Sequence, residues 1–153
     1  FEPIKSSSRL IIFGSGHIGS ALAKLAAQFG FEILVVDPRN KPESIEANYL
    51  QEEYTLAVEK IDFKKTDFIA VMTPSHQSDF NTIYTLINKD YQYLGLLGSK
   101  KKVKNASEFL MEKGISKEQI KKIHMPIGLN FNAQEPNEIA LSIMAQIIDI
   151  KNS

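Results

Sequence analysis

The chain has 153 residues, with 18 basic and 18 acidic side chains and no cysteine. This length suits one domain that buries its own core. The zero net charge argues against a general nucleic-acid or membrane-surface binder, and the lack of cysteine excludes disulfides, a thiol nucleophile and a Cys-ligated zinc site. No apolar run approaches the roughly 20 residues that span a bilayer. These properties predict a soluble, cytoplasmic domain with no nucleic-acid or membrane partner.

The N-terminal segment has neither the charged start nor the apolar stretch of a signal peptide. We expect residues 1–7 to be a linker or the cut edge of a longer chain, and residues 8–153 to form one nucleotide-binding domain.

Two short, β-branched apolar runs predict buried strands over residues 9–13 and 32–37. Between them, apolar residues at helical spacing predict a helix that stops at Gly30. Residues 39–53 are polar and contain Pro42, which indicates a loop with room for one short helix.

A weaker third strand is predicted over residues 54–58, and stronger strands over residues 67–72 and 93–97. A helix is predicted from about His76 to Asn88, between the last two strands.

The C-terminal part predicts a lysine-rich helix from Gly98-Ser99 to about Gly114 and a short helix opened by a capping box at residues 116–119. Residues 125–129 indicate a short sixth strand or an extended segment. Pro136 opens a last helix, whose isoleucine stripe we interpret as core, with a homodimer interface as the alternative. Strands that alternate with helices predict an α/β fold, a doubly wound, mostly parallel Rossmann-type sheet of about six strands with helices on both faces.

The first strand runs directly into the turn Gly14-Ser15-Gly16-His17-Ile18-Gly19. A strand, a glycine turn and a helix over residues 8–37 are typical of a dinucleotide-binding βαβ unit. Gly14 permits the tight turn, Gly16 lets a pyrophosphate approach the backbone, and Gly19 lets helix and strand pack closely. The free N–H groups and the positive end of the helix dipole favour an anion there.

Asp37 ends the second strand, 18 residues after Gly19. A carboxylate at this place accepts hydrogen bonds from the adenosine ribose and repels an added phosphate, which favours NAD(H) over NADP. Arg39 weakens this preference because it can meet such a phosphate. The alternative is a Rossmann fold whose pocket is vestigial or holds another ligand.

The segment from Gly98 through Ser99 and Lys100 follows a predicted strand, where ligands of open α/β sheets bind. Cations in the first turn of a helix oppose its dipole, and an anion at Ser99 would reverse that penalty. A solvated lysine face is the alternative interpretation.

Three stretches of the second half carry a resemblance, namely YLGLLGSKKK at 93–102, IHMPIGLN at 123–130 and PNEIALSI at 136–143. Together with the glycine turn and the VDPR segment at 36–39, they resemble the C-terminal Rossmann domain of the XdhC/CoxI family, the accessory factors of xanthine dehydrogenase and related molybdenum hydroxylases. The resemblance implies a chaperone that binds molybdenum cofactor and assists its sulfuration with a cysteine desulfurase. It also implies delivery of that cofactor to the hydroxylase apoenzyme.

Three departures from the family pattern concern the site. The family's T-H-D-H segment is Thr73-Pro74-Ser75-His76 here, so only Thr73 and His76 carry over. Its arginines after Gly-Ser are lysines, which bind phosphate without the bidentate fork. Asn130 and Asn132 replace the Asp and Gly that follow the P-I-G-L motif. The family's cysteine-bearing N-terminal domain is not in this sequence, which is either a fragment or a stand-alone domain.

The sequence offers no acid–base constellation, so we expect a cofactor-binding protein rather than a self-sufficient enzyme. Three separate histidines argue against a metal site, and His124 is expected to be structural. A crevice between the glycine turn, Thr73, His76 and the segment at Gly98 would hold a dinucleotide or the phosphate-bearing pterin. Two alternatives are an NAD-dependent oxidoreductase, with His76 as its candidate catalytic group, and a nucleotide-sensing regulatory domain.

Overall fold

Buried aliphatic residues form the centre of a wholly parallel sheet in the computed structural model, which describes residues 8–153. The expected linker at residues 1–7 lies outside the described residues. Strand β1 (Arg9–Phe13) pairs with β2 (Glu32–Asp37) on one side and β4 (Phe68–Val71) on the other. Strands β3 (Asn48–Gln51) and β5 (Tyr93–Leu96) lie outside them, which gives the order β3-β2-β1-β4-β5.

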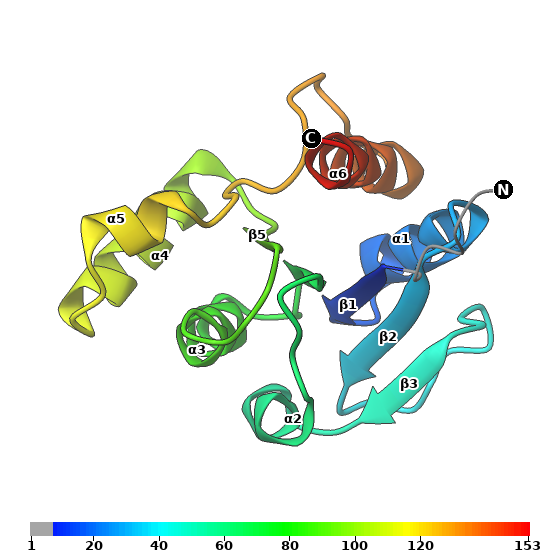
Figure 1. Ribbon diagram of the computed structural model, residues 1–153, viewed down its shortest axis with the longest axis horizontal. Coiled ribbons are helices and arrows are strands. Elements are labelled where there is room, and N and C mark those ends of the chain that lie inside the picture. The colour runs from blue at the N-terminus through cyan, green and yellow to red at the C-terminus, as the bar shows by residue number, and fades with distance from the viewer. Residues whose placement is uncertain (1–7) are drawn as a thin grey trace, which may run out of the picture.

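Helices cover both faces of the sheet (Figure 1). One face carries α1 (His17–Gln28) and α6 (Pro136–Lys151), and the other carries α2 (Tyr54–Lys60), α3 (His76–Leu86), α4 (Lys100–Glu112) and α5 (Lys117–Lys121). Each layer has its own apolar cluster against the strands, because strands buried on both faces supply apolar side chains to both. The predicted Rossmann-type α/β fold is thereby confirmed.

Helix α6 lies beside α1 and belongs to the domain core. Ile143 and Ile147 have no exposed surface, and Ile139 and Ile150 pack against the same apolar cluster. The predicted core role of this stripe is confirmed within a single chain. At 16 residues α6 is the longest described helix, and no helix in residues 8–153 is long and apolar enough to cross a bilayer.

The third strand was predicted in the wrong place. Residues 54–58 lie in α2, where Tyr54, Ala57 and Val58 form one buried helical face while Leu56 is exposed. A short apolar run fits either period, and only the three- and four-residue spacing distinguishes a helix here. The strand itself, β3, lies in the predicted loop, because this edge strand is short and only partly buried.

The sheet has five strands rather than about six. The segment after α5 meets β5 through a single isolated bridge between His124 and Gly95, and Ile127 N–H adds a bond to the Leu96 carbonyl. Pro126, preceded by a cis peptide bond, has no N–H to continue the ladder. Bends lie at residues 125, 126 and 128, and the N–H of Leu129 donates to the Ser142 carbonyl of α6 at 3.1 Å. Residues 125–129 therefore form neither a sixth strand nor a continuous extended segment, and the chain turns from β5 toward α6.

Ile143→Ala tests the assignment of α6 to the core. Removing a fully buried isoleucine leaves a cavity, and we expect the free energy of unfolding to fall by about 2–5 kcal/mol. Urea denaturation followed by circular dichroism measures this loss. The control is Leu141→Ala, two residues earlier and half exposed, which should change stability by less than about 0.5 kcal/mol. Equal effects of the two substitutions would contradict the assignment.

Candidate nucleotide-binding site

The segments that follow four strands lie side by side at the carboxyl edge of the sheet. Gly14 N–H donates to the Val36 carbonyl at 2.9 Å, and Met72 N–H donates to the Phe13 carbonyl at 2.8 Å. Leu97 N–H in turn donates to the Val71 carbonyl at 3.0 Å. The structure therefore brings together the glycine turn, the end of β2, Thr73 and the start of the Gly98 segment.

The strand order changes direction between β1 and β4. The chain leaves β1 through α1 toward β2, whereas β4, the other neighbour of β1, continues through α3 to β5. Open α/β sheets bind ligands at such a switch point, outside the carboxyl ends of the strands. The glycine turn after β1 and Thr73 after β4 flank this switch point.

The three glycines of the turn meet three different surroundings. Gly14 has a φ of +122°, and a Cβ there would lie 2.1 Å from the Met72 carbonyl oxygen. A Cβ on Gly19 would lie 2.2 Å from the Gly14 carbonyl oxygen, so α1 packs directly on the turn. A Cβ on Gly16 would meet nothing within 4 Å. The backbone at Gly16 therefore faces open space, as a site for an approaching phosphate requires.

Helix α1 begins without a side-chain cap and has no acidic residue in its first turn. Its first N–H groups therefore have no side-chain acceptor, and the dipole is positive at the same end. His17, the first residue of the helix, is exposed, and Ile18 is half-buried. These features favour an anion in front of Gly16.

Asp37 has no exposed surface, and the protein itself occupies its carboxylate. Its oxygens accept hydrogen bonds from the backbone N–H groups of Ser15 and Arg39, from Nε and Nη2 of Arg39, and from the hydroxyl of Tyr54. The expectation that this carboxylate receives ribose hydroxyls does not fit the geometry. Asp37 instead joins the glycine turn to the loop after β2 and to α2.

The hydrogen bonds around Asp37 also set its protonation. Burial alone would raise the pKa of this carboxyl, but the bonds from Arg39, Tyr54 and the two backbone N–H groups outweigh it and lower the pKa. Burial and the neighbouring carboxylate raise the pKa of the Tyr54 hydroxyl, which stays a donor. Sequence reasoning missed Tyr54, because it was assigned to a strand with no reason to reach Asp37.

Thr73 precedes α3, and His76 is the first residue of that helix. Thr73 is buried, and its N–H donates to Oδ1 of Asp79 at 2.7 Å. His76 is exposed, and its ring centroid lies 6.1 Å from that of Phe80. The α3 N-terminus is capped by Ser75, which accepts from the N–H of Ser78.

A buried ion pair between Asp79 and Lys102 connects the segment after β4 to the segment after β5. The ammonium of Lys102 contacts Oδ2 of Asp79 and donates to the Leu97 carbonyl at 2.6 Å. A Cβ on Gly98 would lie 2.4 Å from the Lys102 side chain, so the glycine makes room for this pair. Sequence reasoning missed both residues, although Asp79 lies on the apolar face of α3 with Ile83 and Leu86, where a carboxylate requires a partner.

The other residues of the lysine-rich segment lie closer to solvent. Ser99 caps α4 by accepting from the N–H of Lys102 at 3.2 Å, as expected for the start of a helix. Lys100 and Lys101 are exposed. Of the four lysines at the start of α4, Lys102 is therefore buried in an ion pair, whereas Lys100, Lys101 and Lys104 are exposed.

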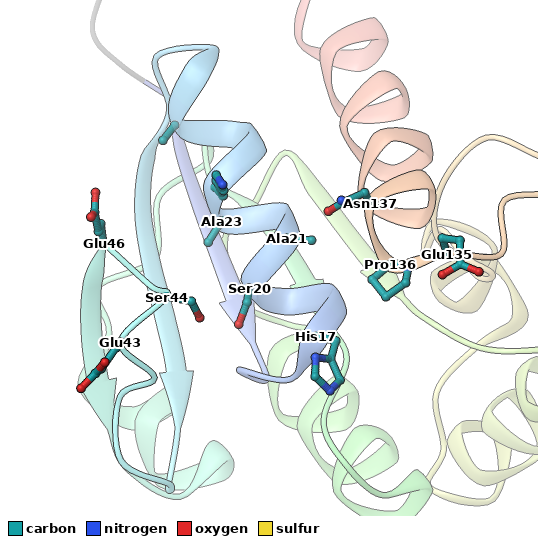
Figure 2. Close-up of a pocket in the computed structure, with 12 residues that line it drawn as sticks. His17, Ser20, Ala21, Ala23, Glu43, Ser44, Glu46, Glu135, Pro136 and Asn137 are labelled. Atoms are coloured by element: carbon teal, nitrogen blue, oxygen red, sulfur yellow. The ribbon is translucent and has the colours of Figure 1, made fainter.

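A cavity of about 600 Å³ runs along α1 (Figure 2). Glu43 and Ser44 border it on one side of the helix, and Pro136 and Asn137 at the start of α6 border it on the other. It includes His17 but neither Gly14, Gly16 nor Asp37. The cavity therefore adjoins the glycine turn without enclosing it. Within residues 8–153, no three His, Asp or Glu side chains are grouped as metal ligands.

Comparison with known proteins agrees with this geometry. The family described as the XdhC Rossmann domain matches residues 10–147. The chain belongs to this family. The resemblance of the motifs in the sequence is thereby confirmed over nearly the whole chain.

Three longer proteins are similar to this chain. The protein YqeB of Escherichia coli (strain K12) is 36% identical over 152 residues, which are 95% of this chain and 28% of that protein. A probable xanthine dehydrogenase subunit of Bacillus subtilis (strain 168) is 31% identical over 157 residues, 98% of this chain and 45% of that protein. A crystal structure of a xanthine dehydrogenase from Bacillus halodurans superposes with a TM-score of 0.81 at 30% identity, and covers 95% of this chain and 43% of that one. The chain thus spans less than half the length of each.

Substitutions of Gly19 and Gly16 should separate packing from ligand access. Gly19→Ala places a methyl group against the Gly14 carbonyl, and we expect it to cost about 1–3 kcal/mol of unfolding free energy. Gly16→Ala meets open space and should change stability by less than about 0.5 kcal/mol. Urea denaturation of both variants measures the difference. Equal destabilisation by both substitutions would contradict the distinct roles.

Asp37→Asn should make the free energy of unfolding depend less on pH in the acid range. Because folding lowers the pKa of Asp37, its contribution to stability is present above the unfolded value of about 3.9 and disappears as the pH falls below it. We therefore expect the stability difference between the wild type and Asp37→Asn to be larger at pH 7 than at pH 3. Urea denaturation at several pH values measures this. Asp90→Asn, at an exposed position, is the matched control and should follow the wild-type curve.

Proposed function

We propose that this XdhC Rossmann domain is the nucleotide-binding part of an accessory factor that assists maturation of a molybdenum hydroxylase. The observation that carries the proposal is the glycine turn, where Gly14 and Gly19 are packed against backbone and Gly16 faces open space beside an uncapped helix. This arrangement suits the pyrophosphate of a dinucleotide. The Bacillus subtilis relative, named as a probable xanthine dehydrogenase subunit, supports the link to the hydroxylase.

The residues at the carboxyl edge can accommodate a dinucleotide, with its pyrophosphate at the glycine turn and one half of the molecule on each side. The pyrophosphate would lie in front of Gly16 and His17, on the free N–H groups of α1. The adenosine half would lie toward the end of β2, at Arg39. The other half would lie across the switch point, toward Thr73, His76 and the exposed start of α4. A nicotinamide dinucleotide supplies hydride chemistry when bound, whereas the residues here supply binding and orientation.

Calorimetric titration of the chain with NADH, NADPH and ADP tests the nucleotide proposal. We expect binding that Gly16→Val weakens at least tenfold, because the side chain would fill the space in front of the turn. The matched control is Ala21→Val, also on α1, which lines the cavity along the helix but not the turn. Absence of heat with every nucleotide, or equal weakening by both substitutions, would refute binding at the turn.

Molybdenum cofactor is the second candidate ligand, because its pterin carries a phosphate that the same N–H groups can bind. The hydroxylase apoenzyme and a cysteine desulfurase are then the proposed partners. Anaerobic purification of the full-length factor, followed by assay of bound molybdopterin, tests this. Stoichiometric absence of the pterin, together with normal hydroxylase maturation in a strain that lacks the factor, would refute the role.

A further inference from the structure

The buried carboxylate of Asp37 has no capacity left for a ligand. A carboxylate offers about four lone-pair sites, and the protein directs five donors at this one, at 2.7–3.0 Å. Its side chain has no exposed surface. A ribose hydroxyl would therefore have to displace a protein donor, which would leave that donor or the carboxylate unpaired.

Arg39 presents a cation at the same place. Its side chain is 53% exposed, although Nε and Nη2 are bound to the two oxygens of Asp37. Within residues 8–153, Nη1 makes no hydrogen bond to a protein acceptor. A guanidinium that uses Nε and Nη2 to bind one carboxylate still has N–H donors, on Nη1, with which to bind an oxyanion. The group that a ligand meets at the end of β2 is therefore the arginine.

The loop after β2 is held against the glycine turn before any ligand binds. The hydroxyl of Tyr49 donates to the Arg39 carbonyl at 2.9 Å and lies 3.2 Å from the hydroxyl of Ser15. Asp37 also accepts from the N–H of Ser15, so the turn, Arg39 and β3 are tied together. This restraint reduces the ordering that binding at Arg39 would require.

We propose that Arg39 contacts the 2′ position of the adenosine ribose and that the ligand of this site is a dinucleotide with a phosphate there, of the NADP(H) class. The end of β2 is where Rossmann folds place that ribose, and a nearby arginine accommodates a 2′-phosphate. The inference rests on the proposed nucleotide-binding function. It reverses the preference that Asp37 alone predicted from the sequence.

Paired titrations of the chain test the preference. The first pair is adenosine 2′,5′-bisphosphate against 5′-AMP, and the second is NADPH against NADH. Each pair differs only in the 2′-phosphate. We expect the 2′-phosphorylated member to bind at least tenfold tighter in both pairs, with the difference shrinking as salt is added.

Arg39→Ala should reverse the preference, because it removes the cation and opens the Asp37 carboxylate to the ribose. We expect NADPH to bind at least 30-fold more weakly than to the wild type, and NADH to become the tighter ligand. Arg39→Lys, which keeps the charge without the fork, should give an intermediate ratio. The matched control is Lys41→Ala, an exposed cation of the same loop, which should keep the wild-type ratio. Circular dichroism confirms that each variant is folded.

Two outcomes would overturn the inference in distinguishable ways. If the wild type binds 5′-AMP and NADH as tightly as their 2′-phosphorylated partners, or Arg39→Ala leaves the ratio unchanged, the assignment of Arg39 is wrong and the nucleotide proposal stands. If no member of either pair binds, the nucleotide-binding function fails and the inference fails with it.

Discussion

The close approach of two backbone segments at Gly14 is the constraint on which the carboxyl edge depends. The Gly14 Cα lies where a side chain would collide with the Met72 carbonyl, and the Gly14 carbonyl in turn lies against Gly19. Gly14 thus permits the close approach of the ends of β1 and β4, and Gly19 permits the close approach of the turn and α1. Any larger residue would separate these elements. The switch point therefore depends on two residues without side chains, and Gly16, which lies between them in the sequence, faces open space.

Asp37 performs a structural task at a position usually read as a ligand contact. Its pairing with Arg39 is half-exposed on the arginine side, whereas the carboxylate itself is shielded, so the visible charge at the end of β2 is positive. The spacing from the glycine turn located this residue correctly. Its role could not be read from spacing, because that role depends on Tyr54, Ser15 and Arg39, which reach Asp37 only in the folded chain.

The sequence predicted the parts of the fold that depend on local signals. Strands β1, β2, β4 and β5 and the isoleucine stripe of α6 are strongly apolar with a clear period, and all were assigned correctly. The failures share a physical cause. In residues 54–58 a short apolar run fits two periods, and β3 is a four-residue edge strand stabilised by pairing with β2 rather than by its own composition. Tertiary contacts decided both.

The candidate site likewise has one part that a local motif predicts and another that depends on tertiary contacts. The glycine turn follows from a motif, whereas the pairing of Asp79 with Lys102 joins two helices that are distant in the sequence. Only the position of a carboxylate on an apolar helix face hinted at it. No residue pattern in the sequence indicated which lysine of the segment would be its partner.

Two ion pairs fix the geometry of the segments at this edge. Asp37 with Arg39 fixes the loop beside the glycine turn, and Asp79 with Lys102 fixes the segments after β4 and β5. Burying a charge pair contributes little net stability, because desolvation offsets the attraction. The pairs therefore act mainly by holding these segments in fixed positions. The two pairs lie on opposite sides of the switch point, and the backbone of Gly14 and Thr73 lies between them. The N–H groups at the start of α1, the half-exposed guanidinium of Arg39 and the exposed Lys100 and Lys101 remain on the solvent side of this edge. A rigid edge of this kind lowers the cost of binding an anionic nucleotide.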